Sequence, residues 1–309
     1  MSGESVSVDD AAKPASSQWL DVAAILICTL AWGTTWYAIT LQLGVVDPVI
    51  SVTYRFTLAA VLLFAWCFVR GESLAITRAQ HAAAFGVGVS TFTINYALVY
   101  LAEQWVTSAV VAIVFAAMAF MNLIGFRIAF GQRASLLAWI AALLGIAGIC
   151  LLSWDEVMSA NFDTLAMTGI GLTLVGVAAS VVGNIYARRG ELAGSTIAAS
   201  TGWAMAYGAG VLALFALVTG KPWAFEFTPA YVGSLLHLSL IGSVIAFLMY
   251  YGLARRRGYA LASYISALAP LVAMVVSTLF EGKSWGVLAL GGVALVLFGQ
   301  FLLLRSRRT

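Results

Sequence analysis

Apolar runs of about twenty residues, separated by very short polar breaks, fill almost the whole sequence. A helix needs about 20 apolar residues to cross the hydrocarbon core, and backbone inside lipid must satisfy its own hydrogen bonds. Of the residues, 62% are hydrophobic and only 9% are charged. The sequence therefore predicts an all-α integral membrane protein of the lipid bilayer with ten transmembrane helices. The ten runs are 19–42, 48–69, 80–101, 106–129, 134–153, 167–188, 196–219, 230–253, 259–280 and 285–304.

The basic residues orient these helices. If the amino terminus lies inside, the outer side receives only Lys221 and Lys283, and Arg55 falls within the second run. The other thirteen of the sixteen Lys and Arg residues then face the cytoplasm, as the positive-inside rule requires. We therefore predict that both termini are cytoplasmic, with residues 1–18 and 305–309 as short tails.

The two halves of the chain resemble each other. A shift of 149 residues places Tyr37 on Tyr186, and "YALVYLA" (96–102) resembles "FLMYYGLA" (247–254) at a shift near 151. Because ten helices divide into five plus five and five is odd, the halves must have opposite orientations in the membrane. Inverted repeats of this kind enclose a substrate site near the midplane. The predicted repeats, around one central cavity, are residues 19–153 and 154–304.

The stretch "TLAWGTTWYAIT" (29–40) places two tryptophans deep within the first apolar run. On a helix, Thr35 and Trp36 share the face of Trp32 at three- and four-residue spacing. Gly33 removes a side chain beside them, so this aromatic wall would suit a flat ligand. Alternatively, Gly33 lets a neighbouring helix approach closely and the threonine hydroxyls bond back to their own helix.

Among the polar side chains in the apolar runs, the amides have the strongest need for hydrogen-bond partners. Asn95 and Asn184 must find hydrogen-bond partners or lose roughly 2–7 kcal/mol each. We predict that both line the cavity, together with Tyr96 and Tyr100. The alternative is that these amides form interhelical hydrogen bonds, worth about 0.6 kcal/mol each. Asn122 is a third such amide, with the same two interpretations.

The second half contributes a further aromatic and hydroxyl group. Tyr250 in the eighth run, with Ser263 and Ser266 in the ninth, is assigned to the same substrate site. Pro270 lacks a backbone donor, so it either bends the ninth helix or frees a carbonyl for substrate.

Two ionisable side chains lie at membrane depth. Arg55 is the only charge well inside a run, and an intramembrane ion is by default functional, here as a counter-ion for a substrate carboxylate. The alternative is a structural arginine that extends outward to the interface. His237 is the group whose unperturbed pKa lets it carry protons near neutral pH, unless it serves as a packing residue.

The motifs "AWGTTWYA", "TYRF", "YALVY" and the "ALAP" that leads to "LFEGK" resemble the drug/metabolite transporter superfamily, in its ten-helix EamA-type branch, and are most similar to YddG-type exporters of aromatic amino acids. The resemblance implies two inverted five-helix repeats around a cavity in a bacterial inner membrane. The halves differ, since Met121 and Gln132 stand where the second half has Pro270 and Glu281.

Several absences narrow the function. The acidic residues fall in loops, tails or run ends, which disfavours a cation exporter and favours neutral or zwitterionic substrates. There is no Walker loop, metal-ligand cluster, cofactor motif or catalytic group, and the small net charge of +3 disfavours nucleic acid as a partner. We expect no enzyme and no cofactor.

The predicted function is therefore secondary transport of a small-molecule substrate, namely export of amino acids by alternating access. The aromatic specificity, for Phe, Tyr and Trp, comes from the resemblance. The alternative is a drug or other metabolite exporter of the same fold, with proton coupling left open. A membrane enzyme or a scaffold for partner helices is the other class. An enzyme would need buried ionisable residues for catalysis that this sequence lacks, and a scaffold would not need polar amides at matching depths in both halves. Ten helices suffice to enclose a cavity in a monomer.

Overall fold

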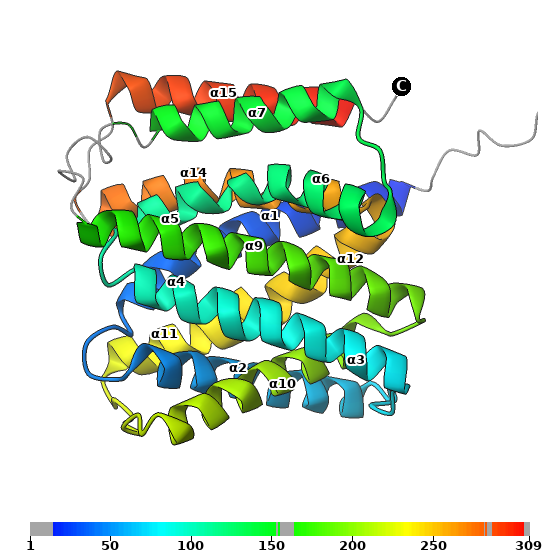
Figure 1. Ribbon diagram of the computed structural model, residues 1–309, viewed down its shortest axis with the longest axis vertical. Coiled ribbons are helices and arrows are strands. Elements are labelled where there is room, and N and C mark those ends of the chain that lie inside the picture. The colour runs from blue at the N-terminus through cyan, green and yellow to red at the C-terminus, as the bar shows by residue number, and fades with distance from the viewer. Residues whose placement is uncertain (1–14, 153, 155–163, 281, 283–285, 306–309) are drawn as a thin grey trace, which may run out of the picture.

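The computed structural model describes residues 15–152, 154, 164–280, 282 and 286–305. Every regular element in these residues is a helix, which confirms the all-α prediction for this part of the chain (Figure 1). Most of the predicted tails, and the positions Glu281 and Lys283, lie outside the described residues. The elements are α1 (Ala15–Thr40), α2 (Pro48–Val69), α3 (Arg78–Val87), the π-helix η1 (Gly88–Asn95), α4 (Tyr96–Ala102), α5 (Ser108–Phe115), α6 (Ala117–Phe130), α7 (Leu136–Leu152), α9 (Thr164–Leu192), α10 (Ile197–Val218), α11 (Pro229–Ser239), the π-helix η2 (Leu240–Ile245), α12 (Ala246–Arg257), α13 (Tyr259–Ala262), α14 (Ile265–Phe280) and α15 (Val287–Arg305).

Seven helices in the described residues are long and apolar enough to cross a membrane. Two of them contain a π-helical segment, because α3–η1–α4 and α11–η2–α12 each form one continuous helical rod. Three shorter apolar helices, Leu136–Gly148, Ile265–Phe280 and Val287–Gly299, cover the other predicted runs. In the described residues each run therefore falls mainly on helix, while ten membrane crossings in two inverted repeats stay a prediction.

Local capping interactions stabilise several helix ends. Asp47 accepts a hydrogen bond from the backbone N–H of Val49 (2.9 Å) and so caps α2. Thr77 and Gln80 form a capping box at the start of α3. Gly131 ends α6 in the left-handed conformation, with φ of 65°, which glycine adopts without a steric penalty.

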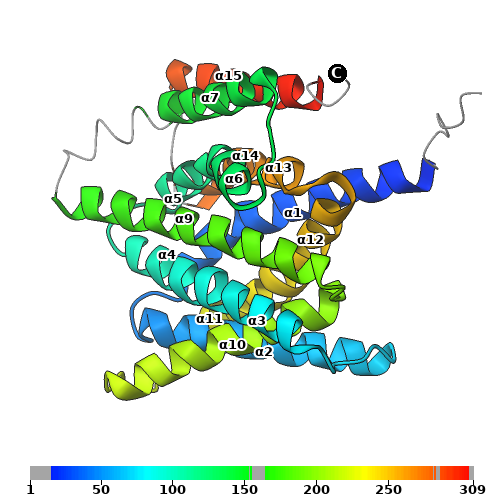
Figure 2. The same cartoon turned by 45° about the vertical axis from the view of Figure 1, so that its right-hand side comes forward.

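Two helix pairs form opposite edges of the bundle. α7 packs along α15 at one edge, and α2 packs along α10 at the other (Figures 1 and 2). The first pair is close, since a Cβ added to Gly148 would lie 2.7 Å from the carbonyl oxygen of Gly292. A Cβ added to Gly299 would lie 2.8 Å from the carbonyl oxygen of Ala141. Small residues of this kind let membrane helices associate through their backbones.

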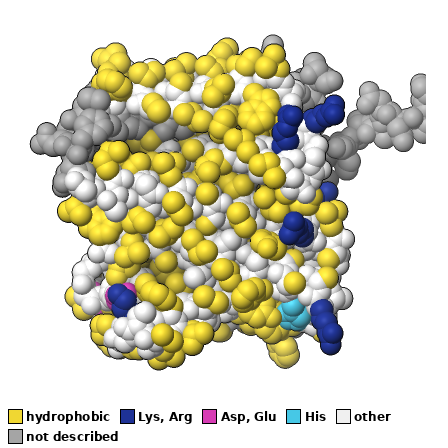
Figure 3. Space-filling view, in the orientation of Figure 1, with side chains coloured by type: hydrophobic (Ala, Val, Ile, Leu, Met, Phe, Trp, Pro, Cys, Tyr) yellow, Lys and Arg dark blue, Asp and Glu magenta, His cyan; other side chains and the backbone are white. Residues whose placement is uncertain are grey.

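The surface is apolar along the helices and charged at their ends. Figure 3 shows a hydrophobic middle, with most Lys and Arg side chains at the end where α1 begins and α15 ends in Figure 1. Large apolar side chains such as Phe68, at 84% exposure, stand on the outside of the helices. Exposed apolar surface of this extent belongs in lipid rather than in water.

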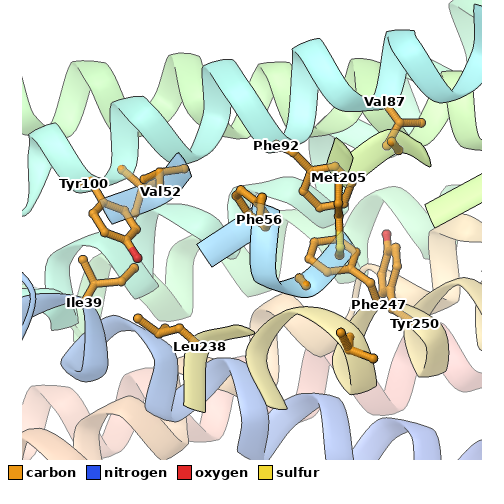
Figure 4. Packing of buried hydrophobic residues seen from close by; sticks show 14 of the residues in the cluster. Ile39, Val52, Phe56, Val87, Phe92, Tyr100, Met205, Leu238, Phe247 and Tyr250 are labelled. Carbon is orange, nitrogen blue, oxygen red and sulfur yellow. The ribbon is translucent and has the colours of Figure 1, made fainter. Parts of the chain in front are cut away.

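A buried aromatic core joins the two rods that contain π-helical segments. The ring of Phe92 in η1 lies 4.9 Å, centroid to centroid, from Phe56 in α2 and also from Phe247 in α12. Figure 4 shows these rings with Met205 of α10 and Tyr250 of α12. All five side chains are buried, so η1 and α12 are held together beside the site.

Candidate functional site

A central cavity with an empty volume of about 630 Å³ lies among α1, η1, α4, α9 and α12, with single contributions from α5, α6 and α14. The wall consists of Trp32, Thr35, Trp36, Ile39, Thr91, Asn95, Tyr96, Val99, Phe115, Met118, Ser180, Asn184, Phe247, Tyr250 and Ser266.

The structure brings together most of the residues that the sequence assigned to a substrate site. Eight of them line the cavity: Trp32, Thr35, Trp36, Asn95, Tyr96, Asn184, Tyr250 and Ser266. Tyr100 and Ser263 are buried elsewhere. The hydroxyl of Tyr100 donates to Oε1 of Gln42 at 2.9 Å, which ties α4 to the end of α1. Substrate contact by the eight residues stays a prediction.

Aromatic rings form one wall of the cavity. The indole of Trp32 lies 5.4 Å from the ring of Phe247 and 5.2 Å from that of Tyr250, while Trp36 lies 5.9 Å from Phe115. The Nε1–H of Trp32 donates to the carbonyl of Gly242 in η2 at 3.2 Å. This bond explains how an indole N–H is satisfied in the middle of a membrane helix.

The two interpretations of the opening stretch apply to different residues. A Cβ added to Gly33 would lie 2.4 Å from the Cβ of Val272, so Gly33 permits close packing of α1 on α14. The hydroxyl of Thr35 donates to the carbonyl of Trp32 at 2.8 Å, as a back-bonding threonine does. Trp32 and Trp36, by contrast, stand on the cavity wall.

Two polar side chains on the cavity wall each have an oxygen that lacks a hydrogen-bond partner. Asn95 Oδ1 and Thr91 Oγ1 are buried close to Gly176 and Gly183 of α9, and they have no hydrogen-bond partner in the described residues. Each such group loses about 1–3 kcal/mol unless a partner is supplied. Asn184 differs, because its Nδ2 donates to Oδ1 of Asn122 at 3.3 Å and so links α9 to α6. For this pair the interhelical interpretation holds, although Asn184 also lines the cavity.

Arg55 is fully buried, at 0% exposure, and does not line the cavity. Its Nε donates to Oγ of Ser243 at 3.0 Å, and its Cζ lies 4.5 Å from the ring centroid of Tyr96. The alternative that this arginine extends outward to the interface is therefore wrong. Neither Nη atom has a hydrogen-bond partner, and no acidic side chain pairs with the guanidinium among the described residues. Arg55 thus stacks on a ring that itself faces the cavity.

His237 and Pro270 lie outside the cavity wall. Nε2 of His237 is 3.0 Å from Oγ1 of Thr34, so the imidazole joins α11 to α1. Pro270 is buried inside α14 and has no N–H to donate to the carbonyl of Ser266 four residues before it. Since Ser266 lines the cavity, the expected effect of the proline falls on a residue of the site.

Apolar wall residues escaped the sequence analysis. Phe115, Met118 and Phe247 line the cavity, yet each belongs to an apolar run in which lipid-facing and cavity-facing positions look alike. Thr91 and Ser180 carried a detectable signal, because each lies four residues before one of the two predicted amides.

Known proteins resemble this chain over most of its length. It is 29% identical over 296 residues to the "Uncharacterized inner membrane transporter YedA" of Escherichia coli K12, which covers 90% of this chain and 91% of the relative. It is 24% identical over 291 residues to "Protein PagO" of Salmonella typhimurium, which covers 91% and 92% of the two chains. Neither name specifies an aromatic substrate, so YddG-type specificity stays a prediction.

A solved structure, described as "Crystal structure of protein", superposes with a TM-score of 0.75 at 18% identity, covering 96% of this chain and 99% of the other. At this identity the likeness concerns the fold alone. The model of the EamA-like transporter family matches residues 19–154 and again residues 163–305. Since these two matches cover most of the sequence, the chain belongs to the EamA-like transporter family and is a membrane transporter.

Proposed function

We propose that the protein exports aromatic amino acids through the central cavity by alternating access. One observation carries the proposal, namely that Asn95 and Thr91, whose buried side-chain oxygens lack hydrogen-bond partners, line the same cavity as the aromatic wall at Trp32 and Tyr250. A flat ring fits against the wall. The ammonium and carboxylate groups supply the donors and acceptors that the polar atoms lack.

The charges around the cavity support a zwitterionic substrate. No acidic or basic side chain of the described residues lines the wall, so nothing there would pair with a net cation. The nearest charge is Arg55, which stacks behind Tyr96. Its field makes the Tyr96 side of the cavity positive, which favours the carboxylate of an amino acid at that side.

Two inverted repeats, 19–153 and 154–304, supply the alternating motion in this proposal. The family model matches the chain twice, once in each repeat. The packing supports a two-fold relation, because α1 contacts α12 and α14 just as α9 contacts α3–α4 and α5–α6. The π-helical segments η1 and η2 begin at positions 152 residues apart, close to the sequence shift between the halves. Rocking of one repeat against the other would expose the cavity to each side in turn.

The proposed location is a bacterial inner membrane with both termini in the cytoplasm. The most basic end of the bundle is the end at which α1 begins and α15 ends (Figures 1 and 3), as the positive-inside rule requires for cytoplasmic termini. The helices of one chain enclose the cavity, so a monomer suffices. Facilitated downhill export needs no titratable residue on the cavity wall. The second candidate function is proton-coupled export of a drug or another metabolite, in which His237, outside the wall, would have to carry the proton.

Uptake of labelled phenylalanine into proteoliposomes tests the proposal, with and without a pH gradient. We expect uptake without a gradient by the wild type and a loss of most uptake in Asn95→Ala. Thr93→Ala is the matched control, since Thr93 belongs to the same segment η1 but donates to the carbonyl of Gly208 at 3.1 Å, away from the cavity wall. Uptake of drug-like amines but not of phenylalanine would favour the second candidate, and a strict requirement for the gradient would establish coupling.

A further inference from the structure

A second cavity, with an empty volume of about 350 Å³, lies where α3, α9, α10 and α12 meet. It is at the end of α12 that carries three consecutive arginines. Of the described residues, none lines both this cavity and the central one. The second cavity is therefore a separate compartment on the basic side of the bundle.

Two hydrogen-bond donors on its wall lack an acceptor within the described part of the chain. They are the hydroxyl of Tyr251 and the Nε of Arg255. The two residues are four apart on α12 and so share a helix face. Tyr251 is only 5% exposed, and a buried donor without an acceptor is unfavourable. A ligand that carries acceptor atoms would remove this deficit at both groups at once.

The guanidinium of Arg255 is held in position for such a ligand. Its Nη1 donates to the carbonyl of Ser195 at 2.6 Å, and its Nη2 approaches the Ser195 hydroxyl at 3.3 Å. Both contacts are to neutral groups, so they orient the guanidinium without neutralising it.

The acidic side chains of this region form ion pairs with other arginines, although Glu191 also lies close enough to interact electrostatically with Arg255. Glu191 binds Arg188 at 2.5 Å, and Asp21 binds the two arginines that follow Arg255 on α12. No ion pair of the described residues includes Arg255. A fixed arginine without an ion pair, in the same cavity as a tyrosine hydroxyl, is a site for an anion whose oxygens only accept hydrogen bonds.

Aromatic rings on the walls of the two cavities contact one another. The ring of Tyr251, on the second cavity, lies 5.4 Å from that of Tyr250 and 5.7 Å from that of Phe247, centroid to centroid. Tyr250 and Phe247 both line the central cavity. The second cavity is therefore linked to the proposed transport site through rings that contact each other.

We infer that the second cavity captures the carboxylate of the transported amino acid before it enters the central cavity. The carboxylate accepts hydrogen bonds from the Tyr251 hydroxyl and from Nε of Arg255, and rotation of the Tyr250 and Phe247 rings then admits the substrate. This inference rests on the proposed function and adds to it an initial binding site for the substrate at the basic, cytoplasmic side of the bundle.

The first test is sided transport in oriented membrane vesicles. Tyr251→Phe removes only the unpartnered hydroxyl, so it should leave folding intact. From the basic face we expect the KM for labelled phenylalanine to rise about tenfold, the change produced by losing one hydrogen bond to a charged group, with kcat within about twofold. From the opposite face the KM should stay unchanged. An equal change from both faces, or no change, would overturn the inference.

The matched control is Tyr207→Phe, which removes a hydroxyl that lies 2.8 Å from Nδ1 of His81, outside both cavities. We expect no side-specific change in this variant. A side-specific rise in KM in the control would also contradict the inference.

Equilibrium binding to the purified protein separates this inference from the proposed function. The probes are 3-phenylpropionate, which has a carboxylate and no ammonium group, and 2-phenylethylamine, which has the reverse. Tyr251→Phe should weaken binding of 3-phenylpropionate about tenfold and leave the amine unaffected. If vesicles fail to transport phenylalanine but 3-phenylpropionate still depends on Tyr251, the proposed function fails and the capture site stands. If 3-phenylpropionate is insensitive to Tyr251→Phe, the capture site is refuted whatever the transport result.

Discussion

Replacing Trp32 by leucine should weaken the binding of phenylalanine about 2- to 12-fold while leaving the binding of leucine nearly unchanged. The indole of Trp32 lies on the cavity wall, 5.2 Å from the ring of Tyr250. A ligand ring placed against it gains about 0.5–1.5 kcal/mol from aromatic contact beyond the burial of apolar area. Leucine retains apolar burial but not this contact. Because about 1.4 kcal/mol corresponds to a tenfold change in affinity, the expected range follows.

The same substitution has a predictable effect on stability. It deletes the hydrogen bond from Nε1 of Trp32 to the carbonyl of Gly242 (3.2 Å), so the free energy of unfolding should fall by about 0.5–1.5 kcal/mol from this bond alone. Trp203→Leu is the matched control. Its Nε1 also donates to a backbone carbonyl, that of Leu74 at 2.9 Å, and its ring stacks on Tyr207, but it does not line the cavity.

Calorimetric titration of the two amino acids into the detergent-solubilised protein measures the affinities, and thermal unfolding measures the stability. Both variants should lose stability, but only Trp32→Leu should lose preference for phenylalanine over leucine. If Trp32→Leu weakened both ligands equally, or if Trp203→Leu had the same effect, the aromatic wall would not be what recognises a ring.

Three further predictions concern helix packing and helix capping. In Gly183→Ala the new Cβ would lie 1.8 Å from Oγ1 of Thr91, so thermal unfolding should show a loss of about 1–3 kcal/mol, which Thr91→Ala in the same chain should partly restore. Asp47→Ala should lower the free energy of unfolding by about 0.5–2 kcal/mol because α2 loses its cap, whereas Asp47→Ser, which keeps a capping oxygen and loses the ion pair with Lys221 (2.8 Å), should lose less; equal losses would contradict the capping role. Gly148→Leu should separate α7 from α15, seen as loss of a disulfide formed by engineered cysteines across the pair, and an unaffected cross-link would show that the close backbone approach is not needed.

The sequence predicts the helices and much of the cavity wall because both depend on short-range patterns. Apolar run length decides where helices lie in lipid, and helical spacing places Thr35 and Trp36 on the face of Trp32. Asn95 and Asn184 stand out because an amide is rare and demanding in an apolar run. These signals need no knowledge of which helices are neighbours.

The remaining features depend on tertiary contacts. Phe247 and Met118 look the same in sequence whether they face lipid or a cavity. Tyr100 lies four residues after Tyr96, as a wall residue would, yet its hydroxyl reaches Gln42 near the end of α1 instead. Burial of Arg55 requires Ser243, nearly two hundred residues away in the chain, so no local pattern distinguishes it from an arginine that extends to the interface.

The π-helical segment η1 determines the direction in which α4 presents its side chains. A π-helical turn closes hydrogen bonds from residue i to residue i+5, so it holds more residues than an α-helical turn. Deleting one residue within Gly88–Asn95 would rotate every later side chain of the rod by about 100° around its axis, and Tyr96 would leave both Arg55 and the cavity. The segment therefore sets the rotational position, around the helix axis, of the side chains that follow it. A one-residue insertion or deletion in η1, or in η2 of the second rod, would turn the cavity-facing side chains away from the cavity while the helix itself stayed intact.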